Sequence, residues 1–93
     1  MSTAIVFVHV DNDRIPEVAE QIAAIDGISE VYSVTGRIDL IAIVRVASFD
    51  DVAPVVADAL AKVPGVRQTE THLAFRAYSR HDLDATFSIG ISD

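Results

Sequence analysis

The 93-residue sequence contains no cysteine, so it offers no disulfide framework and no thiolate for metal binding or nucleophilic catalysis. Basic residues are also few: 7 Lys and Arg stand against 14 Asp and Glu, a formal net charge of -7. Nucleic-acid-binding domains usually carry a basic patch, so direct contact with DNA or RNA is not expected. No apolar run approaches the ~18 residues of a membrane-spanning helix, and no export signal is recognisable. These absences favour a protein of the reducing cytoplasm that contacts neither nucleic acid nor membrane.

Apolar residues, in contrast, are abundant. They make up 51% of the sequence against 23% charged residues, a balance that excludes an intrinsically disordered tail. The length suits one domain. We therefore predict a single domain over residues 1–93, with a core at 4–77, a C-terminal extension at 78–93 and no helix-turn-helix unit.

The sequence repeats itself at an offset of about forty residues, the length of a supersecondary unit. This offset aligns residues 4–8 with 42–46 and brings Gly27 over Gly65. Each copy has the pattern of strand, helix and strand. Two copies give the order β-α-β-β-α-β, with Gly36 and Arg37 in a tight connection between the second and third strands.

The pattern predicts an α+β, ferredoxin-like sandwich, in which two helices cover one face of a four-stranded antiparallel sheet. Short β-branched runs predict the strands, and apolar residues at helical spacing predict the helices. The expected strands are 5–10, 28–35, 40–46 and 66–77, and the expected helices are 14–25 and 52–63. Asp13 is expected to cap the first helix, Asp50 or Asp51 to cap the second, and Gly27 to end the first.

Two helices cannot cover both faces of this sheet, yet both central strands are apolar on both faces. Ile5 and Phe7 alternate with valines in the first strand, and Ile41 and Ile43 alternate with apolar residues in the third. We expect the uncovered face to pack against a second copy in a sheet-to-sheet homodimer. Residues 85–91 also alternate, which predicts a short extra edge strand or tail for this sheet or a neighbour's.

Candidate chemistry is sparse. His9 and Asp11 share one face of a strand end, but no further ligand completes a metal site. His72 lies on a strand, and His81 beside Asp82 is not a dyad without supporting geometry. Nucleophile-elbow, Walker and dinucleotide-binding motifs are absent from the sequence. We expect no metal, no cofactor and no catalytic residue.

The connection between the second and third strands is more informative. Asp39 is a carboxylate at the mouth of an otherwise apolar strand, where burial without a partner would be costly. A small zwitterion could use this carboxylate for its ammonium group and Arg37 or backbone amides for its own carboxylate. Thr69 and Thr71 could line the same pocket or pair across the sheet. The residues alone leave the ligand and structural interpretations about even.

Residues 31–40 with their G-x-x-D core, followed by 63–71, resemble the effector-binding RAM domain of Lrp/AsnC-family transcriptional regulators. The resemblance covers residues 4–77. It implies homodimers, higher homo-oligomers and an amino-acid effector bound between dimers. The matching site residues are Thr35, Gly36, Arg37, Asp39, Leu40, Thr69 and Thr71. The sequence departs from the family in beginning at the first strand and in having Ile38 where an aromatic residue usually precedes the aspartate.

We therefore predict a non-enzymatic amino-acid-sensing and oligomerisation module that modulates transcription indirectly, through full-length Lrp/AsnC-type regulators. The alternative is a small dimeric α+β barrel enzyme, a cofactor-independent monooxygenase or isomerase, with His9, His72 or His81 as acid or base. A third class, an ACT-like amino-acid domain, normally has a glycine-containing turn after the first strand. Residues 11–16 contain no glycine.

Overall fold

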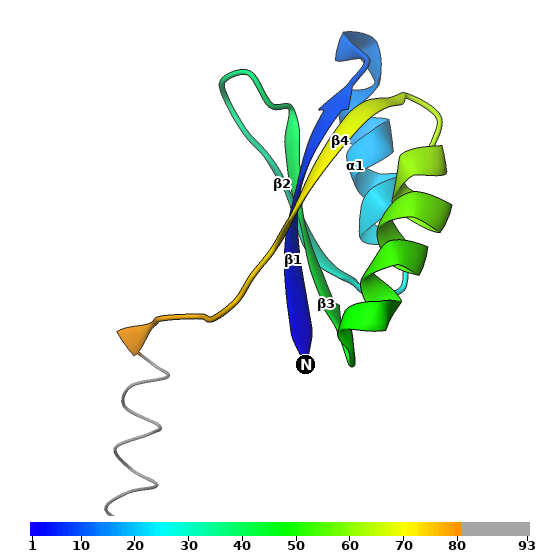
Figure 1. Cartoon of the computed structure of the whole chain (residues 1–93). Helices are drawn as coiled ribbons and strands as arrows, with labels where there is room; N and C mark the ends of the chain where they lie inside the picture. Colours follow the sequence, from blue (N-terminus) through cyan, green and yellow to red (C-terminus); the bar gives the residue numbers. More distant parts are fainter. Residues whose placement is uncertain (81–93) are drawn as a thin grey trace, which may run out of the picture.

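The computed structural model describes residues 1–80 of the chain. Four strands form one antiparallel sheet in the order β2-β3-β1-β4. The strands are β1 (Ser2–Val10), β2 (Ile28–Ser33), β3 (Leu40–Val46) and β4 (Val66–Leu73). Helix α1 (Ile15–Ala23) and a second helix over residues 49–62 lie on the same face of the sheet (Figure 1). This confirms the predicted ferredoxin-like fold; the expected extra strand at 85–91 lies outside the described residues.

The two helices begin differently from the prediction. Helix α1 follows a 3₁₀ turn, η1 (Asn12–Arg14), and Arg14 rather than Asp13 stands at its N-cap, with no side-chain capping bond. The second helix is capped by Ser48, whose amide donates to Asp51 Oδ2 at 3.3 Å. Predicting Asp50 or Asp51 as the cap was therefore wrong, because the reciprocal pair starts two to three residues earlier.

The second helix is irregular along its length. It passes from a 3₁₀ turn, η2 (Phe49–Asp51), into a π-helical stretch, η3 (Pro54–Ala59), and ends in a 3₁₀ turn, η4 (Leu60–Lys62). Pro54 begins the π-helical stretch, and because proline has no amide hydrogen it donates no helical hydrogen bond at that point. Val52, Val55 and Leu60 are nevertheless buried, so the apolar stripe still faces the sheet.

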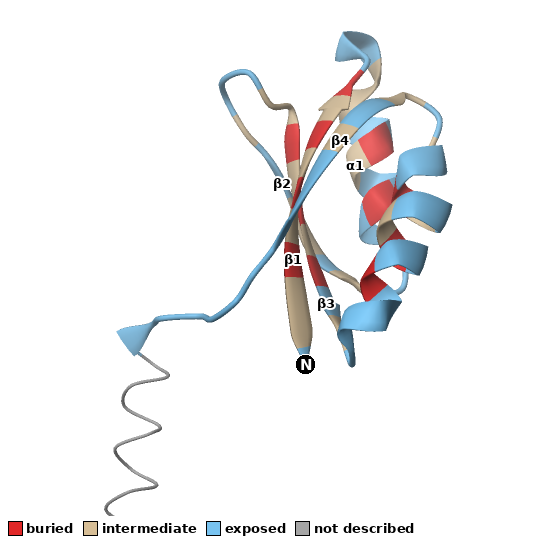
Figure 2. Cartoon of the chain, viewed as in Figure 1, coloured by how far each residue is buried: buried red, intermediate tan, exposed pale blue. Residues whose placement is uncertain are grey.

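The core lies between the helices and one face of the sheet. Burial alternates strictly along the central strands: β1 buries every second residue from Ala4 to Val10, and β3 buries Leu40, Ala42 and Val44. Val18 and Ile22 of α1 complete this layer from above. Figure 2 shows buried positions on the strands and on the sides of the helices that face them. The residues between the buried ones point to the opposite face, which no helix covers among residues 1–80.

Gly27 ends the first helical unit, as predicted. Its φ is +98°, and a Cβ built there would lie 2.6 Å from Val55 Cγ2. Its carbonyl accepts a hydrogen bond from the Arg45 amide at 2.8 Å. A side chain is therefore excluded both by the backbone conformation and by the second helix, which packs directly over this turn.

Candidate functional site

The connection between β2 and β3 is a six-residue loop, 34–39, that is anchored at its base. The Val34 amide donates to the Asp39 carbonyl at 3.1 Å, and the Asp39 amide donates to the Val8 carbonyl at 3.1 Å. Gly36 at the tip has φ +107°, with open space around the position of a Cβ. Thr35, Gly36 and Arg37 are exposed. Hydrogen bonds thus attach the base of the loop to β1 and close it on itself, while the polar tip is exposed to solvent.

The Asp39 carboxylate has a structural partner. The Val10 amide donates to Asp39 Oδ2 at 2.9 Å in a partly buried setting. The pairing of β1 with β4 shifts register between His9 and Val10, so the strand geometry is irregular at this amide. Within residues 1–80, Asp39 Oδ1 has no hydrogen bond. The carboxylate therefore holds the loop to β1 through one oxygen and has a second oxygen that a ligand could use.

A hollow of about 270 Å³ opens beside this loop on the uncovered face of the sheet. Five residues line it: Phe7, His9, Arg37, Ile38 and Glu70. We call it the hairpin hollow. It brings a guanidinium and a carboxylate to one place together with an aromatic ring and an aliphatic side chain. Such a set can bind a zwitterion with an apolar side chain.

The seven predicted site residues do not lie together. Arg37 lines the hairpin hollow, and Thr35, Gly36 and Asp39 belong to the same loop. Leu40 is fully buried beneath the helices. Thr69 and Thr71 pair with Val8 and Val6, whose side chains face the helices, so both threonines point away from the hollow.

Glu70 was missed because both alternating sets of β4 are polar. The sequence offers Thr69 and Thr71 on one face and Gln68, Glu70 and His72 on the other. Only the pairing with β1 decides between them: Glu70 lies opposite Phe7, a residue of the uncovered face. The apolar alternation of β1 was the available signal, since neighbours across an antiparallel sheet share a face.

The uncovered face carries an apolar strip made by Ile5, Phe7, Ile41 and Ile43, all half-buried. Ile5 pairs with Ile43 and Phe7 with Ile41, so the four side chains form one block across the central strands. We call it the open-face strip. It runs directly into the hairpin hollow, because Phe7 belongs to both. The central strands are therefore apolar on the uncovered face as well as on the face that packs against the helices, as the sequence predicts.

Polar pairs flank the open-face strip on both edge strands. On β4, His72 Nε2 lies 2.6 Å from Glu70 Oε2, and the His72 ring lies 5.0 Å from the Phe7 ring, centroid to centroid. On β2, the Tyr32 hydroxyl donates to Glu30 Oε2 at 2.6 Å, and Arg45 Nη2 lies 3.5 Å from Glu30 Oε1. The Tyr32 hydrogen bond, aided by Ser29 and Arg45, holds the pKa of Glu30 below 4.5, and the same carboxylate raises the pKa of Tyr32 above 10.0.

Removing the Tyr32 hydroxyl should raise the pKa of Glu30 towards 4.5. The depressed pKa adds stability that is present above the pKa of the unfolded chain and is lost as pH falls through the folded value. Tyr32→Phe should therefore reduce this contribution, so that less stability is lost as pH falls from the unfolded to the folded pKa of Glu30. A carbon-13 NMR titration of the Glu30 carboxyl group measures the change. Tyr78→Phe, at an exposed tyrosine, is the matched control, and an equal pKa in both variants would contradict the assignment.

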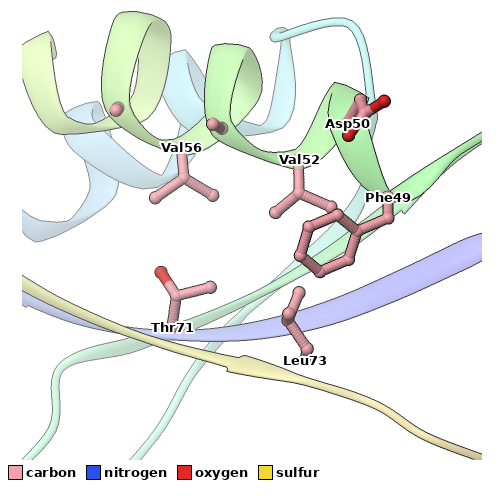
Figure 3. Close-up of a pocket in the computed structure, with 8 residues that line it drawn as sticks. Phe49, Asp50, Val52, Val56, Thr71 and Leu73 are labelled. Atoms are coloured by element: carbon pink, nitrogen blue, oxygen red, sulfur yellow. The ribbon is translucent and has the colours of Figure 1, made fainter.

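A second hollow lies on the other side of the sheet, between the second helix and β4 (Figure 3). Its volume is about 510 Å³, and we call it the helix groove. Figure 3 shows Thr71 and Leu73 of β4 pointing towards Phe49, Val52 and Val56 of the helix. The lining is almost entirely apolar: Phe49, Asp50, Val52, Ala53, Val56, Ala57, Thr71 and Leu73.

The histidines bear on the alternative of a barrel-type enzyme. That alternative needs a histidine in a pocket between the sheet and the helices. Of the described histidines, His9 lines the hairpin hollow and His72 lies on the uncovered face, and neither lines the helix groove. His81 lies outside the described residues.

Among residues 1–80, no group of three or more His, Asp or Glu side chains is placed to hold a metal ion. Among the same residues, no helix has the length and apolar character needed to cross a membrane.

The sequence matches the family model of the Lrp/AsnC ligand-binding domain over residues 3–83. Similar curated proteins include an uncharacterized HTH-type transcriptional regulator from Pyrococcus furiosus, 40% identical over 77 residues that span 80% of this chain and 51% of that protein. The Bacillus subtilis HTH-type regulator YugG is 38% identical over 66 residues, or 71% of this chain and 39% of that protein. The chain therefore spans about half the length, or less, of these relatives.

Solved structures share the fold. A Thermus thermophilus protein, TTHA0845, is 42% identical, with a TM-score of 0.80 over 86% of this chain and 100% of its own. Escherichia coli AsnC is 16% identical, with a TM-score of 0.77 over 84% of this chain and 53% of its own. A Neisseria meningitidis transcriptional regulator, solved with L-methionine, is 15% identical, with a TM-score of 0.74 over 85% of this chain and 53% of its own. At these lower identities the likeness concerns the fold alone.

Proposed function

Because the chain belongs to the family of Lrp/AsnC ligand-binding domains, we propose that it is a non-enzymatic module that binds an amino-acid effector and assembles with copies of itself. The observation that carries the proposal is the continuity of two features. The open-face strip is an apolar patch that a partner surface would cover. The hairpin hollow opens at the end of this strip and shares Phe7 with it. Ligand and partner would therefore meet the same residues.

The chemistry of the hairpin hollow suits a free amino acid. Arg37 supplies a planar pair of donors for a carboxylate, and Glu70 supplies an acceptor for an ammonium group. Asp39 Oδ1 is a second acceptor in the adjoining loop. Phe7 and Ile38 form an apolar wall for the side chain of the ligand. This set of groups favours amino acids with apolar side chains over small anions. A small anion could pair with Arg37, but it has no ammonium group to bind Glu70.

The open-face strip favours a homodimer in which two sheets pack face to face. Four apolar side chains on adjacent central strands form a self-complementary patch, as a two-fold axis requires. Polar pairs on β2 and β4 would form the rim of this interface. An effector in the hairpin hollow would shift assembly to the extent that it binds one assembly more tightly than another. Higher homo-oligomers would form by contacts between such dimers.

An influence on transcription would pass through other proteins. The curated relatives are HTH-type transcriptional regulators, and this chain aligns with about half of the length of each. Its net charge of -7 disfavours contact with DNA phosphates. Mixed assembly with full-length Lrp/AsnC-type regulators, through the shared sheet face, would let the effector act on a DNA-bound partner.

The direct test is titration calorimetry against the twenty amino acids, together with native mass spectrometry with and without each one. L-methionine is a natural first probe, because the Neisseria meningitidis regulator was solved with it. We expect binding of at least one amino acid with a change in oligomer distribution, and weaker binding in Arg37→Ala. Arg67→Ala is the matched control, since Arg67 is exposed, pairs with Asp11 and does not line the hollow. An absence of binding for all twenty, with unchanged mass, would overturn the proposal.

A further inference from the structure

The helix groove is an apolar surface whose large side chains remain open to solvent. Phe49 is 62% exposed and Leu73 is 43% exposed, although both line the groove together with the buried Val52. Figure 3 shows Phe49 reaching from the helix towards Leu73 of β4. Large apolar side chains gathered around a hollow of about 510 Å³ indicate a surface on which a further apolar group packs.

The chain leaves the sheet directly after β4. The Ala74 amide donates to the Thr3 carbonyl at 2.9 Å, and residues 75–79, which we call the arm, then run away from the sheet and from both helices (Figure 1). The arm contains no helix and no strand. Its two aromatic side chains, Phe75 and Tyr78, are exposed. The protomer thus presents an aromatic segment to solvent at some distance from its own helices.

The arm and the groove carry opposite charges. Residues 74–80 include Arg76 and Arg80 and no acidic residue, although the net charge of the whole chain is -7. On the other side, Asp50 lines the groove, and residues 49–62 contain three aspartates and one lysine. Among residues 1–80, neither Arg76 nor Asp50 forms an ion pair. Unpaired charges of opposite sign beside two apolar surfaces favour contact between those surfaces.

The arm suits the groove of another chain better than the groove of its own. Leu73 already lines the groove, and Phe75 follows it by only two residues. To enter the same groove, the chain would have to reverse its direction at once, whereas Figure 1 shows it running away from the helices. A groove on a second copy requires no such reversal.

We propose that the arm of one copy packs in the helix groove of a second copy, with Phe75 and Tyr78 in the hollow and Arg76 beside Asp50. Each chain offers one arm and one groove, so two copies can exchange arms about a two-fold axis and fill both grooves. The four exchanged aromatic side chains would bury roughly 600–1,000 Å². With a comparable area of groove covered, the total reaches the ~1,200–2,000 Å² of a specific interface.

Arm exchange deepens the proposed function and rests on the self-assembly stated there. The helix groove lies on the helix side of the sheet, whereas the open-face strip lies on the opposite face. One chain can therefore use both surfaces at the same time. Sheet-to-sheet packing makes the dimer, and arm exchange supplies the contact that joins one dimer to the next.

A charge swap tests the contact. Arg76→Asp and Asp50→Arg should each reduce the population of species larger than a dimer at least tenfold, because like charges then meet. An equimolar mixture of the two variants should restore these species, since the arm of each variant then carries the charge opposite to the groove of the other. Native mass spectrometry measures the distribution. Arg67→Asp, at an exposed arginine that does not line the groove, should leave it unchanged.

The outcomes separate arm exchange from the homodimer. Larger species that persist in both single variants, or a mixture that stays at the dimer, would overturn arm exchange. Unaltered protein that forms dimers and nothing larger would overturn arm exchange alone. Unaltered protein that stays monomeric would overturn both arm exchange and the sheet-to-sheet homodimer.

Introduced thiols give a second test, because the chain has no cysteine of its own. Ala77→Cys places a thiol in the arm, and Ala57→Cys places one in the groove. When the two variants are mixed with oxidised glutathione, they should cross-link at least tenfold faster than Ala77→Cys mixed with Ala61→Cys. Ala61 is an exposed alanine of the same helix that does not line the groove. Equal rates would overturn the proposal, and so would a disulfide formed mainly within one chain of Ala57→Cys/Ala77→Cys.

Discussion

Replacing Ile41 with aspartate should convert the assembled protein into a folded monomer. Ile41 lies in the open-face strip between Phe7 and Tyr32, so a face-to-face partner would bury the new carboxylate without a counter-ion. An unpaired buried charge costs about 3 kcal/mol or more, and a two-fold dimer would contain two of them. At about 1.4 kcal/mol for each factor of ten, the dimer Kd should rise roughly ten-thousandfold.

The fold of the single chain should survive this change. Ile41 is only half-buried in the protomer and points away from the core, so aspartate remains in contact with water when the partner leaves. Sedimentation velocity measures the mass, and far-UV circular dichroism checks the fold. Ile41→Val keeps the strip apolar, and Ser33→Asp places the same charge on an exposed edge residue. Both controls should remain assembled. A dimer of Ile41→Asp with unchanged Kd would show that another surface holds the copies together.

The architecture was predictable because three independent signals agree. The internal repeat, the alternation of the central strands and the glycine that ends each helix all require two strand-helix-strand units. Gly27 shows why the last signal is strong: its positive φ and the packing of Val55 exclude any side chain. The predicted ends were less accurate. The strand expected at 66–77 ends at Leu73, which pairs with Ala4 of β1.

The helix caps show where local sequence misleads. Asp13, Asp50 and Asp51 all have the chemistry of a cap, so the sequence alone does not rank them against their neighbours. In the structure Asp51 has a supporting role: it accepts from the Ser48 amide and leaves the N-cap position to that serine. Which of several competent residues becomes the cap depends on where β3 releases the chain, and this is set by sheet pairing.

The candidate site was predictable only in part, for a geometric reason. The loop from Thr35 to Asp39 could be recognised because glycine, arginine and aspartate stand out beside an apolar strand. The far wall of the hollow comes from β4, where both alternating sets are polar and the sequence does not say which faces the helices. Choosing Thr69 and Thr71 selected the set on the helix side of the sheet, whereas Glu70 lines the hairpin hollow on the other face.

Asp39 is placed for two roles, because one carboxylate oxygen anchors the loop to β1 and the other is available to a ligand. Its Oδ2 accepts from the Val10 amide, which lies at the register shift between β1 and β4. Asp39→Ala should therefore destabilise the fold by about 2 kcal/mol, the usual cost of a backbone donor left without an acceptor. Asp39→Asn keeps an oxygen for that amide, so its stability should fall by only about 1 kcal/mol, the difference between a charged and a neutral hydrogen bond.

Amino-acid binding should separate the two roles of Asp39. If Oδ1 accepts from the ammonium group of the effector, both variants lose a charge-assisted bond worth about 1.5–3 kcal/mol, and Kd should rise roughly 10- to 150-fold in each. Chemical denaturation measures stability and calorimetry measures affinity, so a fully folded Asp39→Asn with weakened binding is the expected signature. An Asp39→Asn protein that binds as tightly as the unaltered chain would restrict this aspartate to holding the loop on β1. Recognition of the ammonium group would then fall to Glu70, the other carboxylate at the hollow.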